Sequence, residues 1–263
     1  MADALTLKGI VFPCYDFKEK DKLIPYLTRD MGLIKLCAKG ASGRSSKFAA
    51  LTVPFSICDI TFTESNGFYY VKDYVINESN SSIQKSLDLI TAASHIYECV
   101  KVCASDSVGS DKLYELCVYA LYSLNIGKDY KTVCSLFNWK LLDILGLSII
   151  YTNCSNCMNP IIEDKNYHLG ISSGKLLCSS CTMKQNLKDT VVVYGKVLSF
   201  LNEVKQGELK KIFAYKVSED MQKFLVEYTE CCISAALEAD LFSLKHYEET
   251  LFKFSIPSDP GKA

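Results

Sequence analysis

The chain has 263 residues, of which 49% are hydrophobic and 22% are charged, and its formal net charge is −1. This balance is typical of a folded globular protein and excludes a wholly disordered chain. Its thirteen cysteines favour reduced thiols in the cytoplasm, some of them bound to metal, over a disulfide framework.

The beginning of the chain and its apolar runs argue against secretion and membrane insertion. Met1-Ala2-Asp3-Ala4 has no basic segment before an apolar block, so we expect no secretory signal. The longest apolar run, Leu141–Tyr151, is interrupted by Asp143 and stays short of the roughly 18 residues of a membrane helix. We therefore expect a cytoplasmic protein.

Residues 1–78 are rich in β-branched and aromatic residues and are predicted to form a β domain. The expected strands are Leu5–Phe17, Lys22–Thr28, Gly32–Lys39, Phe55–Thr63 and Phe68–Ile76. Asn66-Gly67, between the last two, is a strong hairpin signal because both residues of a type I′ turn need positive φ. Five short antiparallel strands predict a small closed barrel, which leaves no exposed sheet edge.

Residues 79–152 and 183–256 are predicted to form an α-helical domain, which follows the polar linker Asn77–Ser82. Apolar residues recur there at spacings of three and four. The expected helices are Leu87–Cys103, Leu113–Leu124, Val133–Leu145 closed by Gly146, Val191–Leu201, Gly207–Tyr215 and Glu219–Leu237, with a weaker segment to about Phe254. Residues 257–263 are expected to be a disordered tail. The predicted fold class is α+β.

Two Cys-x2-Cys pairs, Cys154/Cys157 and Cys178/Cys181, stand twenty residues apart within residues 153–182. This spacing predicts a tetrahedral Zn²⁺ site in a small insert. Four thiolates leave no open coordination position, so the metal is expected to be structural. The alternatives are free cysteines and a thioredoxin-like dithiol; the second is disfavoured because neither pair is expected to open a helix after a strand.

The remaining chemistry-bearing residues predict no catalytic site. Most other cysteines are expected to be small buried residues, including Cys99, Cys103, Cys117, Cys134, Cys231 and Cys232. The histidines His95, His168 and His246 are scattered, and we expect them on helix faces or at the surface. Motifs for zinc deaminases and phosphate loops fail at required positions. The protein is therefore not expected to be an enzyme.

Residues 18–47 hold eight basic and three acidic residues, a local charge of +5. Lys35 and Lys39 share one face of an expected strand with Cys37, while Ile34, Leu36 and Ala38 take the other. The candidate nucleic-acid contacts are Lys20, Lys22, Arg29, Lys35, Lys39, Arg44 and Lys47. The aromatic residues Phe48, Phe55, Phe68, Tyr69, Tyr70 and Tyr74 could stack on bases. A solvated charged face and core packing of the aromatic residues are the competing interpretations.

The order of these parts resembles the bacterial RecO family of DNA repair proteins. The resemblance rests on Gly9-Ile10-Val11, Asp21–Ile24, Leu27–Lys35, Ala38–Ala41, Phe137–Gly146 and the four cysteines. It implies an OB-fold barrel, a helical domain and a zinc ribbon. It also implies binding and annealing of single- and double-stranded DNA, contacts with RecR and the single-strand-binding protein SSB, and help in loading RecA.

Two departures from the family pattern affect where DNA is expected to bind. The family's Lys-Gly-Ala-Arg loop reads Lys39-Gly40-Ala41-Ser42 here, with the arginine displaced to Arg44, and residues 238–249 are acidic where relatives are commonly basic. We therefore expect a DNA site on the barrel, in a cytoplasmic, nucleoid-associated protein. The alternative is a protein–protein adaptor of the repair machinery with little DNA affinity of its own.

Overall fold

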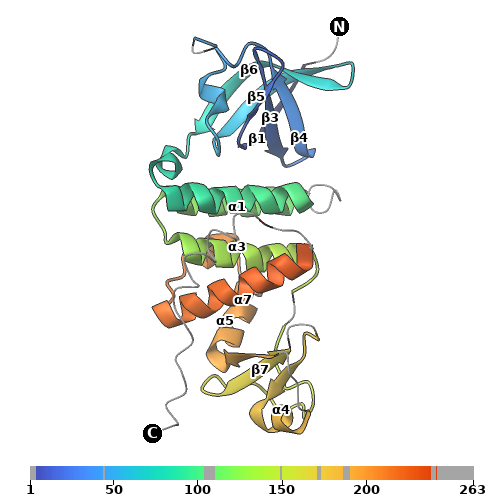
Figure 1. Ribbon diagram of the computed structural model, residues 1–263, viewed down its shortest axis with the longest axis vertical. Helices are drawn as coiled ribbons and strands as arrows, with labels where there is room; N and C mark the ends of the chain where they lie inside the picture. Colours follow the sequence, from blue (N-terminus) through green and yellow to red (C-terminus); the bar gives the residue numbers. More distant parts are fainter. Residues whose placement is uncertain are drawn as a thin grey trace.

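The computed structural model describes residues 4–43, 45–103, 110–148, 150–170, 173–185, 190–237 and 241. The molecule is elongated (Figure 1): a β-barrel lies at one end, helices form the middle, and a small insert containing β7 and α4 lies at the other end. Among the helices in these ranges, none combines the length and apolarity needed to cross a membrane. Arg44, the weak segment after residue 241 and the tail at 257–263 lie outside the described residues.

The barrel has an OB-like topology. Its strands are β1 (Ala4–Val11), β2 (Tyr15–Phe17), β3 (Asp21–Thr28), β4 (Gly32–Ala38), β5 (Ile57–Ser65) and β6 (Phe68–Glu78). They are arranged in the order β1-β5-β6-β4-β3-β2, and a β1–β3 pairing closes the barrel. One pairing is not antiparallel as expected: β4 and β6 run parallel, with Leu36 opposite Tyr69. Parallel neighbours require a crossover connection. Here the chain between β4 and β6 contains β5, which forms a hairpin with β6.

Two strand predictions need correction. The first expected strand is divided into β1 and β2; Pro13 lies at the break and has no N–H to donate to a ladder. The last strand continues to Glu78, so Asn77 belongs to β6 and not to the linker, because pairing with β5 resumes after a register shift near Ile57. The predicted hairpin turn is confirmed, with φ of +51° at Asn66 and +74° at the following glycine.

The main hydrophobic cluster inside the barrel is apolar except for the hydroxyl of one buried tyrosine. Its members are Val11, Ile24, Tyr26, Leu36, Ala38, Ala41, Phe48, Leu51, Cys58, Ile60, Phe62 and Val71. The hydroxyl of Tyr26 donates to the carbonyls of Leu7 at 2.7 Å and Cys58 at 2.8 Å, so its burial leaves no polar group unpaired. A Cβ at Gly9 would lie 2.5 Å from the Tyr26 ring, which explains why glycine occupies that position.

The helical body closes one end of the barrel (Figure 1). It comprises the short helix η2 (Ser81–Lys85), α1 (Leu87–Cys103), α2 (Ser110–Asn125), α3 (Tyr130–Ile144), α5 (Gly195–Gln206), α6 (Leu209–Ile212) and α7 (Glu219–Leu237). Phe12 of the barrel stacks on Tyr97 of α1 with ring centroids 4.6 Å apart. As predicted, Gly146 follows the end of α3, with φ of +73°. His95 lies on a helix, α1, as one of the two expectations held, and it is buried.

The insert is a three-stranded sheet with one short helix. It contains β7 (Asn166–Gly170), β8 (Leu176–Cys178), α4 (Ser179–Gln185) and β9 (Thr190–Tyr194), with the strand order β8-β7-β9. The helix expected from Val191 is therefore wrong in its first residues. Val191–Val193 are β-branched and pair with β7, which favours a strand, and α5 begins only at Gly195.

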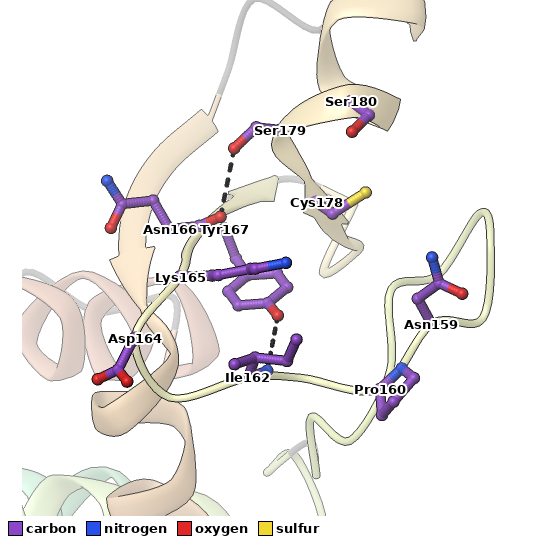
Figure 2. Close-up of a pocket in the computed structure, with 10 residues that line it drawn as sticks. All are labelled: Asn159, Pro160, Ile162, Asp164, Lys165, Asn166, Tyr167, Cys178, Ser179 and Ser180. Atoms are coloured by element: carbon purple, nitrogen blue, oxygen red, sulfur yellow. Dashed lines mark hydrogen bonds between the residues drawn. The ribbon is translucent and has the colours of Figure 1, made fainter.

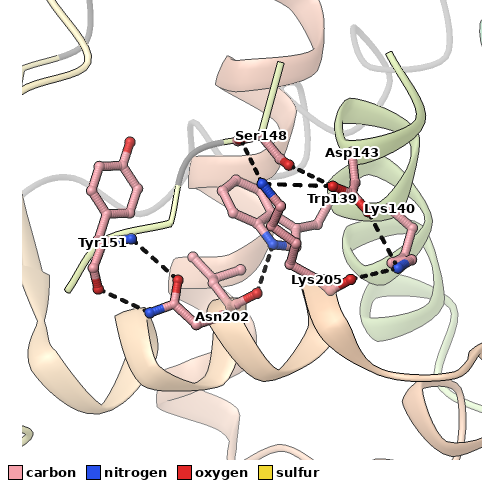
Figure 3. Close-up of polar contacts among 8 residues, drawn as sticks. Trp139, Lys140, Asp143, Ser148, Tyr151, Asn202 and Lys205 are labelled. Carbon is pink, nitrogen blue, oxygen red and sulfur yellow. Dashed lines mark hydrogen bonds and ion pairs between the residues drawn. The ribbon is translucent and has the colours of Figure 1, made fainter. Parts of the chain in front are cut away.

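A polar network ties the root of the insert to the helical body (Figure 3). The Trp139 indole donates to the Leu201 carbonyl at 2.8 Å, and the Lys140 ammonium donates to the Lys205 carbonyl at 2.8 Å. Lys205 in turn donates to the carbonyl of Ser148 at 2.9 Å. These bonds join α3, the segment that enters the insert and α5, so they set the direction in which the insert projects.

Candidate functional site

The four cysteines of the insert converge on one point. All four Sγ atoms lie within 4.8 Å of one another, and Cys157 Sγ is 3.8 Å from Cys178 Sγ. Two sulfurs bound tetrahedrally to one metal at about 2.3 Å would be about 3.8 Å apart. A disulfide would bring them to about 2.05 Å, and none of the thirteen cysteines, all of which lie in the described residues, forms one. The residues therefore fit a four-thiolate metal ion.

Backbone turns aim the sulfurs inward. In the first pair, the amide of Met158 donates to the Cys154 carbonyl at 2.9 Å, and Met158 adopts a left-handed φ of +58°. In the second pair, Cys178 ends β8 and Cys181 lies in α4. This pair does open a helix after a strand, so the sequence argument against a thioredoxin-like dithiol was wrong. The convergence of all four thiols, and not of one pair, is what favours metal binding.

Hydrogen bonds prepare the sulfurs to carry negative charge. The amide of Cys178 donates to Cys154 Sγ at 3.3 Å, and the Asn156 side chain donates to Cys181 Sγ at 3.3 Å. Burial opposes the Cys154 thiolate, but backbone N–H groups outweigh it and lower the pKa of Cys154 to about 6. The Asn159 N–H favours the Cys157 thiolate, but the neighbouring thiols, Cys154 first, raise the pKa of Cys157 to about 11. The thiols of Cys154 and Cys157 therefore lose their protons as an interacting pair and not independently.

A second cluster lies on the outside of the barrel and combines aromatic rings with lysines. The Phe68 ring lies 6.4 Å from both Phe17 and Tyr70, measured between centroids. Lys18 Nζ lies 5.3 Å from the centroid of Phe17, and Lys39 Nζ lies 4.4 Å from that of Tyr70. We call these five residues the aromatic–lysine row. It offers ring faces flanked by positive charge, and 47% of Phe68 is exposed.

The barrel topology assembles this row from distant segments. The end of β2 contributes Phe17 and the turn after it contributes Lys18, whereas the β5–β6 hairpin contributes Phe68 and Tyr70. The parallel pairing of β4 with β6 sets Cys37 opposite Tyr70, which brings Lys39 at the end of β4 over the Tyr70 ring. Lys18 has a left-handed φ of +56°, a conformation that is uncommon for a residue with a side chain.

The predicted cationic residues fall into different environments. Lys20, Lys35, Lys39 and Lys47 are exposed. Lys22 is half-buried and pairs with Asp16 at 3.4 Å. Arg29 forms an ion pair with Glu115 of α2, so its charge is compensated at the junction between barrel and helices. Lys47 donates to the carbonyl of Lys72 at 3.2 Å. Of the seven candidates, Lys39 alone is in the row, and Arg44 lies outside the described residues.

Sequence reasoning missed part of the row and included two core residues. Phe48 and Phe55 are buried, as the competing interpretation held. Phe17 and Lys18 were not selected, although an aromatic residue directly before a lysine-rich turn was a visible signal. Four of the six remaining cysteines named above are buried as expected, but Cys232 is half-buried and Cys231 is exposed. Cys37 shares the outer strand face with Lys35 and Lys39, yet it is buried.

Comparison with known proteins covers nearly the whole chain. Residues 1–80 match the family model described as "Recombination protein O N terminal", and residues 84–245 match "Recombination protein O C terminal". The DNA repair protein RecO of Clostridium perfringens is 28% identical over 228 residues, which are 86% of this chain and 90% of that protein. Those of Caldicellulosiruptor saccharolyticus and Caldanaerobacter subterraneus are 23% and 26% identical, over 92% of this chain and 96% and 98% of theirs.

Proposed function

The chain belongs to the RecO family of DNA repair proteins, and we propose that its barrel binds DNA through the aromatic–lysine row. The observation that carries the proposal is the alternation of exposed rings and ammonium groups in that row. The row lies at the loops that follow β2 and β5. Because β1 and β2 are the two parts of one divided strand, these loops correspond to the 1–2 and 4–5 loops with which OB-folds bind ligands.

The chemistry of the row suits single-stranded DNA. Unpaired bases stack on aromatic side chains, and every base has a ring face to offer, so such stacking is tolerant of sequence. Lysines neutralise phosphates and release counterions, which adds affinity without reading bases. Duplex DNA hides its base faces, so we expect the lysines, including Lys20 and Lys35, to supply its weaker binding.

We propose further that the protein anneals complementary strands during recombinational repair and acts with RecR and SSB to load RecA. Family membership supports this role. Neutralising one strand lowers its repulsion of the second strand, so annealing needs no nucleotide hydrolysis and no catalytic residue. With DNA as its substrate, the protein would act in the cytoplasm at the nucleoid.

We propose that the four insert cysteines hold one structural Zn²⁺. Cys154, Cys157, Cys178 and Cys181 would be its ligands, since soft thiolates in tetrahedral arrangement suit zinc. Bound zinc would cross-link the two cysteine turns. Its place at the end of the molecule opposite the barrel (Figure 1) separates this structural role from DNA binding.

Fluorescence anisotropy with labelled oligonucleotides tests the DNA proposal. The full chain is titrated into unrelated single-stranded sequences at low and at moderate salt. We expect similar affinities for the different sequences, weaker duplex binding and a loss of affinity as salt rises. A protein that does not bind oligonucleotide even at low salt, while folded by circular dichroism, would contradict the proposal.

One observation favours the alternative of a protein adaptor. Arg29 and Lys22, two of the candidate DNA contacts, are engaged in ion pairs within the protein. If the anisotropy titration shows no binding, the remaining lysines are a solvated face, and the helical body and insert are the surfaces to test for binding to repair proteins.

A further inference from the structure

The four sulfur atoms of the insert differ in their access to solvent. Cys154 is fully buried and Cys181 is 5% exposed, whereas Cys157 is exposed and Cys178 is half-buried. The two more exposed cysteines come from different Cys-x2-Cys turns, and their Sγ atoms lie 3.8 Å apart. One side of the cluster is therefore closed, and the open side presents one thiol from each turn.

A pocket gives a second route to this open side. It has a volume of about 580 Å³, and its lining includes Cys178, Asn159, Lys165, Ser179 and Ser180. Figure 2 shows Cys178 next to the two serines, with the loop that carries Asn159 on the other side. Cys178, Ser179 and Ser180 line the pocket together, so a small polar molecule that occupies it lies against the residue that carries the sulfur.

We propose that Cys157 and Cys178 are a peroxide-sensitive pair whose oxidation to a disulfide releases the metal. As a ligand of the proposed metal, the Cys157 sulfur is deprotonated; it attacks one oxygen of hydrogen peroxide, the O–O bond breaks, and sulfenic acid and hydroxide form. The Cys178 thiolate then attacks the sulfenic sulfur, the S–S bond forms and a second hydroxide leaves. Two thiolates lose two electrons in total, peroxide is reduced, and both hydroxides take up protons to become water.

The metal leaves because the new disulfide removes two of its four ligands. Cys154 and Cys181 remain reduced on the buried side, and two thiolates do not complete a tetrahedral site. The inference rests on the proposed zinc site but not on DNA binding, because the barrel lies at the other end of the molecule (Figure 1).

Metal release and disulfide mapping together test the proposal. The full-length protein, purified with its metal, is freed of reductant and exposed to hydrogen peroxide in the presence of a chromogenic zinc chelator. We expect about one zinc ion released per chain, in step with the appearance of a peptide pair joined through Cys157 and Cys178 in mass spectrometry. Reductant with added zinc should reverse both changes.

A matched variant separates this pair from general thiol oxidation. Cys231 is also exposed but lies in α7, outside the cluster, so Cys231→Ser should release zinc at the wild-type rate. The proposal is overturned if the purified protein contains no metal, or if zinc stays bound while Cys231 oxidises. Release accompanied by a disulfide within one turn, such as Cys154 to Cys157, also overturns it. Oligonucleotide anisotropy on the same samples reports separately on the barrel.

Discussion

The barrel and the insert are two small β modules at opposite ends of one helical body (Figure 1), and they are stabilised differently. The barrel encloses a core of twelve buried residues, from Val11 to Val71. The insert's own cluster has three buried members, Cys154, Leu177 and Cys181, and two of these are candidate metal ligands. Apolar burial therefore stabilises the barrel. In the insert, Tyr167, Leu169, Leu176 and Val193 join the core of the helical body, whereas the cysteine turns have few buried apolar residues of their own, so the proposed ion would stabilise those turns.

This difference determines where each module can carry function. The barrel's core accounts for its fold, so its outer surface is free to display Phe68 and Lys39 to a ligand. In the insert, the four thiols that could bind a metal are also the groups on which the cysteine turns converge, so a change to them would alter the structure as well as the chemistry. Function is therefore separable from stability in the barrel and inseparable from it in the insert.

Removing the metal should give the largest effect and should be confined to one end of the molecule. Structural zinc contributes roughly 10–16 kcal/mol in model peptides, which is far more than three buried residues provide. A strong chelator, or Cys154→Ser, should release the cysteine turns, so the amides of Cys154 and Met158, which are hydrogen-bonded within the first turn, should exchange quickly while Ile60 stays protected. Hydrogen exchange measures this. If the barrel and the insert lost protection equally, the claim that the two modules are stabilised differently would be contradicted.

Removing two rings from the aromatic–lysine row should have the next largest effect, on binding and not on folding. Loss of base stacking costs about 1–3 kcal/mol per base, so Phe68→Ala with Tyr70→Ala should weaken single-strand binding at least tenfold and duplex binding less. The matched control is Val75→Ala on the same strand, at a residue that is 61% exposed. Anisotropy titrations measure both affinities. If the variant lost the same affinity for single-stranded and for duplex DNA, these two rings would not be the ones that stack on bases.

The helical body between the modules should respond to pH. Burial lowers the pKa of His95, and its hydrogen bond to Asn138 at 2.7 Å offsets this only in part. The unfolded chain binds a proton below about pH 6.5 before the folded chain does, so stability should fall as pH drops from there, by up to about 1.4 kcal/mol per pH unit.

Urea unfolding at pH 7 and pH 5 measures that pH dependence. His95→Gln should be less stable at pH 7 but should lose less on acidification than the wild type. His168→Gln is the control, because His168 is half-exposed and carries no comparable burial. If all three proteins lose the same stability between the two pH values, His95 is not responsible.

The sequence predicted the features that local chemistry determines. The Cys-x2-Cys spacing identified the four cysteines that converge on one point, Asn66-Gly67 identified the hairpin, and the helix Glu219–Leu237 was placed with the bounds that the structure has. In each case the signal lies in residues that are neighbours along the chain. The β9 strand was missed because a run of valines fits a strand and a buried helix face equally well, and only pairing with β7 decides.

The candidate DNA surface was predicted only in part because it depends on contacts between distant segments. Charge counting found Lys39 but also Arg29, whose partner Glu115 lies 86 residues away and is known only from the fold. The row itself needs the parallel pairing of β4 and β6, which no local pattern in residues 32–78 indicates. Tertiary pairing thus decides which cations remain available to a ligand.

The smallest expected effect distinguishes free cations from compensated ones on the barrel. Each lysine that contacts a single-strand phosphate contributes about 0.7 to the slope of log affinity against log salt, so Lys18→Gln with Lys39→Gln should flatten that slope by about 1.4. Arg29→Gln should leave the slope unchanged, because Arg29 already has Glu115 as its partner, and should cost at most about 1 kcal/mol of stability. Anisotropy titrations at several salt concentrations measure the three slopes. A steeper change for Arg29→Gln than for the lysine pair would mean that DNA displaces Glu115, and the binding surface would then lie at the junction of barrel and helices, not along the aromatic–lysine row.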